Sequence, residues 1–503
     1  MFKFKNLTPV NGLDVNNLIN ARQNNYAWSM TELGDYIYVG TGRNIAALAL
    51  YSVAPGITLP ISVDPIAMNN TAEIWRYKKG SEETWERVLI GVPQRDFGFR
   101  FMITYRPFDG NPAIYASTAV MYGHLYVYKT INGVDWKQVS YKVEGGGEIQ
   151  GTSSRGMVVH HGKLYMSTVS DGSSERTPLL YSSKDPEFYP WKLETPSGTD
   201  PKKNPQGTIN NIAVFNDRIY VATATDTGIQ IWRTNGCEPE VDDWTLIVDN
   251  GFGDSDNMMS IAIGVFKKHL YVSGSKELPL SWAIPRGCDI VRIDKYDNWE
   301  VVVGPDSITG IWSGFFNPFN VYTWQIVEYE GKLLAATFDD AINIQTIFET
   351  LLANKEKLSQ PPLSLPPFIV DILIGVYELA VELLNKLNYP FGFDLFVSED
   401  GKHFEPVLLD GLNNRYNYGA RMLYVDSNND LYIGTANPYQ GLEVWKAEEV
   451  YSHCDNELEV NPFDYMSAIE EIEEHFVSLE EYIPQIKEYL PEFIDKYFPK
   501  TNK

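Results

Sequence analysis

The sequence predicts an all-β fold, a β-propeller of seven blades. Three observations predict it: a strand segment recurs seven times, a tight polar turn precedes most copies, and only the last repeat lacks a fourth strand. Six of the seven segments end in threonine. The copies are "YIYVGT" (36–41), "AIYAST" (113–118), "KLYMST" (163–168), "RIYVAT" (218–223), "HLYVSG" (269–274), "KLLAAT" (332–337) and "DLYIGT" (430–435).

The other strands of each unit follow from the same pattern. An apolar run and a Gly/Asn/Asp turn before the repeated segment predict a β-hairpin, and a third strand ending in charge follows it. A fourth strand begins near an aromatic residue: Trp85, Trp136, Trp191, Trp244, Trp299 or Phe404. Four strands in about 50 residues are typical of propeller blades.

The ring is predicted to close through the N-terminus. The seventh unit stops after its third strand, "GLEVWKA", which contains Trp445. We therefore expect residues 2–10, "FKFKNLTPV", to pair beside that strand, which leaves no open edge between the first and last blades.

Three long insertions interrupt the predicted propeller, which spans residues 1–447. Residues 42–71, 276–287 and 338–390 each fall between the second and third strands of a blade, so all three are expected on one face. The last insertion predicts a helical hairpin, which we interpret as a lid over the channel mouth; a packing buttress and a dimer surface are the alternatives. Residues 448–503 predict an acidic helical extension, either docked on the propeller or serving as a dimerisation arm.

One turn carries a resemblance to a known family. "SEDGKHF", with Ser398, Asp400, Gly401 and Phe404, resembles the Asp-box S-x-D-x-G-x-x-W of sialidase-like and kelch-type propellers, and "TINGVDW" at 130–136 is a looser copy. In such families this hairpin lies at the blade periphery, so the resemblance implies the fold and says little about chemistry.

Composition excludes several classes of partner. The formal charge of −25 disfavours nucleic acid and anionic membrane surfaces. The most apolar window holds Asp371, Glu378 and Glu382, which argues against a membrane span. With no apolar leader at the N-terminus, and with three widely spaced cysteines that suggest neither disulfides nor a zinc site, a cytoplasmic location is expected.

The candidate site is predicted where the inner strands begin, because these starts surround the channel axis on the face with the insertions. Arginine is not a turn former, so arginines at this mouth indicate an anionic or carboxylate partner, with pairing to nearby aspartates as the competing interpretation. The predicted catalytic residues are Asp96, Tyr26, Tyr322 and Arg100. The predicted ligand-binding residues are Arg43, Asn44, Arg155, Asn211, Asp256, Asn257, Arg415, Asn417 and Asn437.

No metal site or cofactor is predicted. The sequence has no P-loop, no H-E-x-x-H motif and no EF-hand spacing. The oxygen-rich stretch "DNGFGDSDN", with Asp254 and Asp256, makes calcium a weak alternative.

Three classes of function follow. The first is an enzyme that acts by acid/base or electrostatic catalysis on a small amphipathic molecule with an anionic or polar end, held in a lidded pocket. The second, from the resemblance, is a sialidase-like carbohydrate-active enzyme, whose arginine cluster, tyrosine and acid aspartate have candidates here but whose glutamate cannot be placed. The third is a non-catalytic propeller that binds a ligand or a protein, and a homodimer through the C-terminal helices or apolar insertions would suit it.

Overall fold

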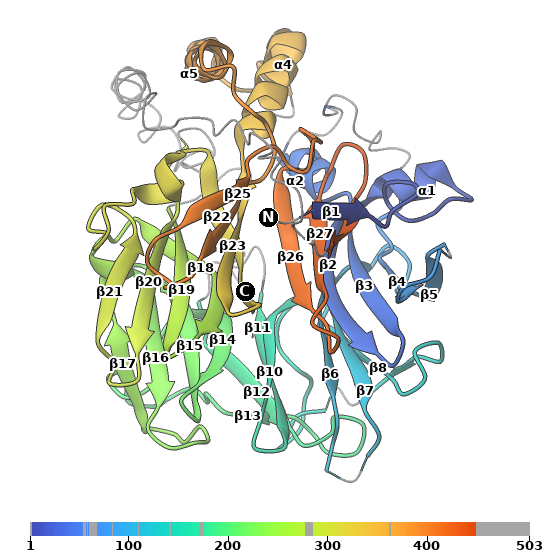
Figure 1. The fold of residues 1–503 in the computed structure, drawn as a ribbon, viewed down its shortest axis with the longest axis vertical. Coiled ribbons are helices and arrows are strands. Elements are labelled where there is room, and N and C mark those ends of the chain that lie inside the picture. The colour runs from blue at the N-terminus through green and yellow to red at the C-terminus, as the bar shows by residue number, and fades with distance from the viewer. Residues whose placement is uncertain are drawn as a thin grey trace, which may run out of the picture.

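The structure is a computed structural model, and the chain is mostly β (Figure 1). It describes residues 3–448 apart from 54–56, 58, 60–67, 83, 109, 140–141, 171–175, 277–284 and 362–363. The predicted extension at 448–503 therefore lies outside the described residues except for Glu448, and so does most of the insertion at 276–287.

The strands form antiparallel groups in which each strand pairs with the next in sequence. The first groups are β2 (Asn24–Leu33), β3 (Tyr36–Arg43), β4 (Glu73–Lys78) and β5 (Glu86–Ile90); β6 (Asp96–Tyr105), β7 (Ala113–Val120), β8 (Val127–Thr130) and β9 (Lys137–Gln138); and β10 (Ser153–His160), β11 (Lys163–Val169), β12 (Leu179–Ser183) and β13 (Lys192–Leu193). Next come β14 (Thr208–Phe215), β15 (Arg218–Thr225), β16 (Gly228–Thr234) and β17 (Trp244–Val248); β18 (Asn257–Phe266), β19 (His269–Lys276), β20 (Asp289–Asp294) and β21 (Trp299–Val303); and β22 (Asn320–Tyr329), β23 (Lys332–Asp339), β24 (Leu395–Ser398) and β25 (Glu405–Leu408).

The last group joins the two ends of the described chain. Here β26 (Gly419–Val425), β27 (Leu431–Ala436) and β28 (Val444–Glu448) are completed by β1 (Lys3–Asn6), which pairs antiparallel with β28 from Lys3↔Glu448 to Asn6↔Trp445. The Val444 amide donates to Thr8 Oγ1 at 2.6 Å, so the contact continues past the strand. The predicted pairing of the N-terminus beside "GLEVWKA" is confirmed.

Neighbouring groups are linked by a tyrosine in the repeated segment. The Tyr115 hydroxyl donates to Asp185 Oδ1 at 3.0 Å, and the Tyr220 hydroxyl donates to Asp297 Oδ1 at 3.3 Å; each aspartate belongs to the next group along the chain. Tyr38 instead lies against Gly133, where a Cβ would meet its hydroxyl oxygen at 1.8 Å. These rings are buried, so each contact fixes one group against the next.

The turns that resemble an Asp-box share one set of hydrogen bonds. Gly401 N donates to Ser398 Oγ at 2.8 Å, and His403 N donates to Asp400 Oδ1 at 2.9 Å. In the looser copy, Gly133 N donates to Thr130 Oγ1 at 2.9 Å. Both turns are thus closed by a side chain that replaces a backbone partner.

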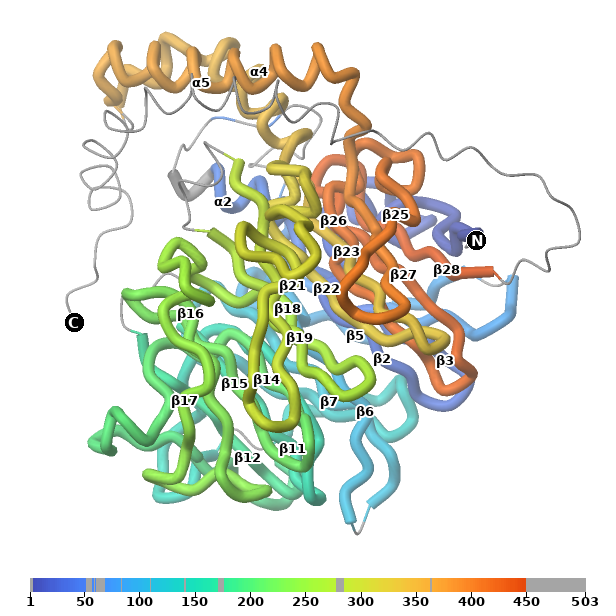
Figure 2. Tube along the Cα trace, turned by 60° about the vertical axis from the view of Figure 1, so that its left-hand side comes forward, coloured from blue at the N-terminus to red at the C-terminus, as the bar shows by residue number. Residues whose placement is uncertain are grey.

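The described parts of the first and last insertions lie at one end of the molecule, at the top of Figure 1. This end holds α2 (Ile45–Val53), α4 (Ala341–Leu358) and α5 (Pro367–Lys386), and Figure 2 shows α4 and α5 running across it. Leu50 and Ile57 of the first insertion pack with Leu358 and Val370, so the two insertions touch. Among the described helices, none combines the length and apolarity that crossing a bilayer requires.

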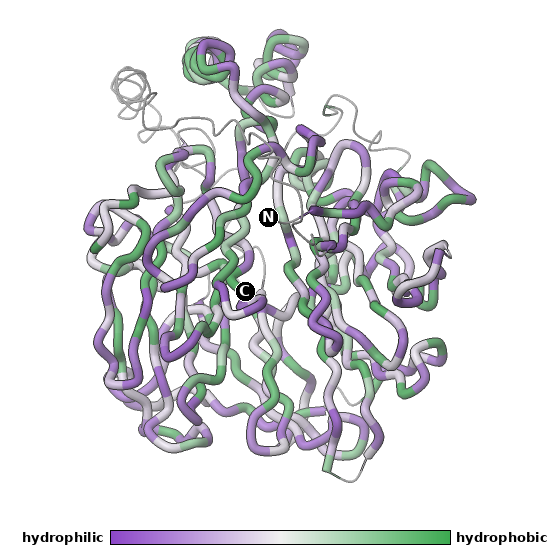
Figure 3. Tube along the Cα trace, in the orientation of Figure 1, coloured by the Kyte–Doolittle hydropathy of each residue, from purple (hydrophilic) through white to green (hydrophobic). Residues whose placement is uncertain are grey.

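The strands and the turns opposite the insertions differ in hydropathy. The strands carry hydrophobic stretches, whereas the turns at the end opposite the insertions are mostly hydrophilic (Figure 3). Short helical elements complete the fold: α1 (Leu18–Gln23) before β2, and the 3-10 turns Asn250–Gly253 and Ser313–Phe316 before β18 and β22. Each inner strand begins at the insertion end and runs toward the opposite end of the molecule. We call that opposite end, with its hydrophilic turns, the polar end.

Deletion of residues 1–10 is expected to lower the melting temperature strongly. It removes β1 and the Thr8 contacts, and it exposes the unpaired edge of β28. Differential scanning calorimetry of the truncated and full chains measures the change. The substitution Lys5→Ala, on the exposed face of β1, serves as the control and should leave the melting temperature nearly unchanged. A truncated chain that melts like the full chain would show that this pairing does not hold the fold closed.

Candidate functional site

Each inner strand contains a bulge, where its register with the second strand shifts. A bulge re-aims the extra side chain and is common beside binding sites. Four of these strands, β2, β6, β18 and β22, carry two such shifts. At the later shift of these four strands, and at the single shift of the other three, the skipped residues are Trp28, Arg100, Arg155, Asn210, Ile261 with Ala262, Trp324 and Arg421.

All of these residues except Ala262 line one cavity of about 130 Å³. All seven inner strands contribute to its wall, so the cavity lies on the axis that they enclose. Besides the bulge residues, the wall contains Ser29, Phe101, Met102, Asn211, Ser260, Gln325 and Met422. Among the predicted site residues, the structure brings Arg100, Arg155 and Asn211 together here.

Two tryptophans and two arginines in the wall form a repeated arrangement. The guanidinium carbon of Arg100 lies 4.9 Å from the Trp28 ring centroid, and that of Arg421 lies 5.5 Å from the Trp324 centroid. A Cβ on Gly98 would meet the Trp28 ring at 2.0 Å, and one on Gly419 would meet Trp324 at 2.0 Å. We call each set a Trp–Gly–Arg unit: Trp28, Gly98 and Arg100, and Trp324, Gly419 and Arg421.

The cavity concentrates positive charge in an acidic protein. Burial lowers the pKa of Arg421 to about 10; the charge of Arg155 lowers it too, whereas Tyr26 and Tyr418 act in the opposite direction. Arg421 therefore stays charged at neutral pH. The described wall contains three arginines and no carboxylate.

An aromatic layer lies between this cavity and the insertions. Tyr26 packs edge-on against Trp28 and Trp324, with centroids 6.0 and 5.9 Å away, and its hydroxyl hydrogen-bonds that of Tyr418. Tyr322 stacks on Phe338 at 5.0 Å. Burial raises the pKa of Tyr26 to about 12.

Leu59 and Ile342 from the insertions belong to the same apolar cluster as this aromatic layer. The predicted residues Tyr26 and Tyr322 therefore lie under the insertions and above the cavity.

Two buried carboxyl groups lie where α4 begins. Burial raises the pKa of both Asp339 and Asp340 to about 7. Asp339 accepts a hydrogen bond from the Tyr389 hydroxyl, and Asp340 accepts one from Asn343 Nδ2 at 2.8 Å. Tyr389 follows α5, so this bond ties together the two ends of the insertion.

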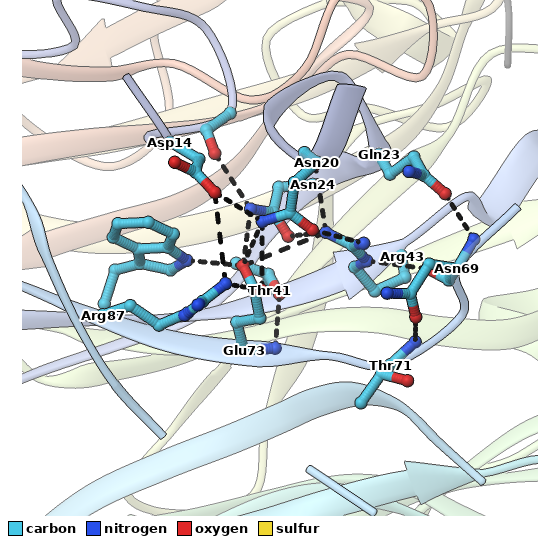
Figure 4. A network of polar contacts seen from close by, with 12 residues as sticks. Asp14, Asn20, Gln23, Asn24, Thr41, Arg43, Asn69, Thr71, Glu73 and Arg87 are labelled. Atoms are coloured by element: carbon cyan, nitrogen blue, oxygen red, sulfur yellow. Dashed lines mark hydrogen bonds and ion pairs between the residues drawn. The ribbon is translucent and has the colours of Figure 1, made fainter. Parts of the chain in front are cut away.

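The predicted residue Arg43 lies in a separate polar network (Figure 4), and Asn44 lies next to it in the chain. Arg43 is fully buried; its Nη1 donates to Asn24 Oδ1 at 2.7 Å and lies 3.9 Å from Glu73 Oε2. Burial lowers the pKa of Arg43 to about 10 and Glu73 acts against that shift. Asn44 donates to Gln23 Oε1 at 3.2 Å. The contacts of both residues connect the first insertion to the start of β2.

The predicted residues Asn257 and Asn417 make a recurring backbone contact. Asn257 Nδ2 donates to the Gly251 carbonyl at 3.0 Å and to Asp289 Oδ2 at 2.9 Å. Asn417 Nδ2 donates to the Gly411 carbonyl at 3.0 Å and to Glu443 at 2.7 Å. Asn24 and Asn320 make equivalent contacts at the starts of β2 and β22. Each such asparagine joins the start of an inner strand to its preceding loop and to the acid that opens the third strand.

Asp96 and Asp256 pair with neighbouring arginines. Asp96 accepts from Arg95 Nη1 at 2.5 Å and from the Val92 amide at 2.8 Å, and burial raises its pKa. Asp256 lies 2.5 Å from Arg286 Nη1.

The remaining predicted residues lie near the insertion end. Arg415 lies over Phe391, 4.3 Å from its centroid, and donates to Gln345 Oε1 at 2.7 Å. Asn437 donates to Asn417 Oδ1 at 3.1 Å. Neither residue lines the cavity.

The acidic stretch considered for calcium is bonded to protein cations. Lys276 Nζ lies 2.7 Å from Asp254 Oδ2 and 2.5 Å from Asp289 Oδ2. Lys276 thus pairs with one of the two aspartates considered for calcium, Asp254, and Arg286 pairs with the other, Asp256.

The sequence interpretation missed the tryptophans, Asn210 and Arg421 as site residues. A signal for them exists: "NYAW" (25–28) and "VYTW" (321–324) place a tryptophan two residues after a tyrosine, and "GFR" (98–100) and "GAR" (419–421) open the next inner strands. The recurrence of this pair of motifs in two places could have identified the two units.

Comparison with known proteins assigns no family. No protein-family model and no curated protein matches the chain. Similar solved structures include the WD40 β-propeller domain of Doa1 (9% identity, 89% of this chain and 97% of that chain, TM-score 0.42). Others are a Mycobacterium tuberculosis puromycin-hydrolyzing peptidase (9%, 87% and 55%, 0.43) and the Pyrococcus horikoshii acylaminoacyl peptidase (8%, 85% and 52%, 0.40). The chain spans about half of each peptidase, and these similarities are too low to assign a function.

Glu73→Gln is expected to destabilise the fold without changing the cavity. The substitution leaves Arg43 buried beside a neutral side chain, and breaking a buried ion pair costs about 3–5 kcal/mol. Chemical denaturation measures the loss. The control Glu86→Gln removes the more exposed partner of Arg76 and should cost about 0–1 kcal/mol. Equal losses in the two variants would contradict the structural role given to the network.

Asp340→Asn is expected to stabilise the protein more at pH 8 than at pH 5. An aspartate in an unfolded chain has a pKa of about 3.9, whereas burial raises the pKa of Asp340 in the folded chain to about 7. Between these two pKa values the folded chain holds more protons than the unfolded chain. The stability of the protein with Asp340 therefore falls as pH rises through this window, and the cost of the buried carboxylate persists at higher pH. Thermal melts across pH measure the difference. The control Asp371→Asn, on the surface of α5, should show no such trend. A stabilisation that is the same at both pH values would contradict this assignment.

Proposed function

We propose that the chain is a seven-bladed β-propeller that binds a small organic anion in its axial cavity. The observation that carries this proposal is the convergence of Arg100, Arg155 and Arg421 from three inner strands on one wall. Charged hydrogen bonds from arginine to a carboxylate or phosphate are among the strongest polar contacts available to a protein.

Binding fits the cavity better than acid/base catalysis does. The described wall offers no carboxylate, histidine or lysine that could exchange a proton with a ligand near neutral pH. A sialidase-like site would need paired carboxylates beside the arginines, and the described wall holds none.

The insertions serve as a lid in this proposal. Leu59 and Ile342 pack onto the aromatic layer at the insertion end. The wall residues that follow the bulges, such as Met102, Gln325 and Met422, extend toward the polar end. We therefore propose that the ligand enters from the polar end and that the lid excludes water from the other side.

Catalysis on the bound anion is the second candidate. Asp339 and Asp340 have pKa values of about 7, where a general acid or base works best. The charge of Asp340 also acts on Tyr26, whose own pKa is influenced by Arg100 and Arg421. Under this alternative, Asp340→Asn abolishes turnover and leaves ligand affinity unchanged.

The test is isothermal titration calorimetry with phosphate, acetate and succinate at low ionic strength. We expect at least one anion to bind, and Arg155→Gln to weaken that binding by about 10-fold or more, because one charged contact is lost. The matched control is Arg76→Gln, which removes an arginine that lies over Tyr36, 4.3 Å from its centroid, outside the cavity. Binding that survives Arg155→Gln unchanged would reject the proposed site.

A further inference from the structure

Two hairpin turns of neighbouring strand groups meet at the polar end of the molecule. The first turn, residues 161–162, joins β10 to β11, and the second, residues 216–217, joins β14 to β15. All four residues have a positive φ, which is typical of a two-residue type I′ turn. The turns are in contact, because His161 Nε2 lies 2.8 Å from Asp217 Oδ1.

A second imidazole lies beside this pair. The rings of His160 and His161 pack edge to face, with their centroids 4.3 Å apart. One nitrogen of each ring and one carboxylate oxygen of Asp217 all lie within 4.8 Å of one another. Two imidazoles and a carboxylate are a donor set that suits first-row transition metals such as zinc.

The contact of His160 with the main chain suits a metal ligand. Its Nε2 lies 2.6 Å from the Cys237 carbonyl oxygen, which can only accept a hydrogen bond, so Nε2 carries the hydrogen. The neutral ring then keeps a lone pair on Nδ1. A metal-bound histidine commonly donates its other ring N–H to a backbone carbonyl, which fixes the ring orientation.

The cluster needs only a small adjustment to close on a metal ion. Zinc bonds of about 2.0–2.2 Å hold the ligand atoms of a tetrahedral site roughly 3.3–3.6 Å apart, and the atoms here already lie within 4.8 Å. The side chains of His161 and Asp217 are 42% and 72% exposed, so both can turn toward an ion. With His160 they supply three ligands, and water takes the fourth position.

The charges around the cluster are compatible with a dication. Lys163 begins β11 directly after the first turn, and its ammonium group pairs with Glu238 at 2.6 Å, which offsets its charge. The formal charge of −25 on the chain also attracts cations to the surface.

We infer that His160, His161 and Asp217 form a binding site for a first-row transition-metal dication such as zinc. The bound ion bridges the β10–β11 and β14–β15 hairpins and so fastens two neighbouring groups of strands together. None of these three residues belongs to the described lining of the axial cavity, so the site is independent of the proposed anion binding.

The test is isothermal titration calorimetry of the full chain, without an affinity tag, with zinc, nickel, calcium and magnesium chlorides. We expect zinc and nickel to bind, whereas calcium and magnesium should not, because these hard cations prefer oxygen ligands. His161→Gln and Asp217→Asn should each weaken zinc binding about 10-fold or more, the least that losing a supporting group costs a metal site. Zinc should also raise the melting temperature of the native chain more than that of either variant.

Two control variants test other ligands. His403→Gln removes an exposed imidazole that pairs with Asp400 at 2.7 Å, in a pair that belongs to no such three-group cluster among the described residues. Cys237→Ser removes an exposed thiol and keeps the carbonyl that His160 contacts. Both controls should leave zinc affinity unchanged.

The remaining outcomes overturn the site. Zinc binding that survives both His161→Gln and Asp217→Asn, or that is lost in either control, assigns the ion to other residues. Calcium binding as tightly as zinc reduces the cluster to an acidic surface. Absence of zinc and nickel binding leaves these side chains as a hydrogen-bonded link between two turns. Thermal melts without metal show whether each variant folds, and anion titrations of the same variants keep this result separate from the proposed function.

Discussion

The contact between a buried tyrosine and the next group of strands sets the geometry on which the rest of the structure depends. Tyr115 and Tyr220 reach carboxylates of the following group, and Tyr38 fills the space that Gly133 leaves. Because the contact recurs in these three places, the groups that make it are held at similar positions relative to the groups that follow them. The bulges then act on strands that are already aligned. The cavity is therefore a product of the repeat as well as of its own residues.

Much of the fold could be predicted from the sequence, because the repeated strand and its turn are local patterns. The closure by β1 followed from counting strands, and the strand pairing confirms it. The site was harder to predict. Asparagines at the starts of inner strands suggested ligand contacts, whereas Asn257 and Asn417 bond glycine carbonyls and buried acids. Side-chain chemistry alone does not separate these two roles, since both require a polar group near the axis.

The bulges explain why Trp28, Trp324 and Arg421 were not among the predicted site residues. Strand patterns assume that side chains alternate between two faces, and one extra residue reverses the alternation from that point. A tryptophan in such a segment therefore suggests a core position between sheets, although the bulge turns it toward the axis. Arg100 and Arg155 were identified because their charge was unusual at the channel, independent of strand register. The cavity lies below the aromatic layer and not at the channel mouth. This position depends on the same bulges, because they turn the wall residues toward the axis.

The pairing of β1 with β28 also governs when the molecule can fold during synthesis. Thr8 and Val444 bond across a separation of 436 residues. At about 5–20 residues per second, the ribosome needs on the order of 20–90 s to make the intervening chain. During that time β1 lacks its partner, because β28 has not yet been made. The pairing of β1 with β28 must follow translation of the last strand, so the nascent chain has a long interval in which aggregation competes with folding.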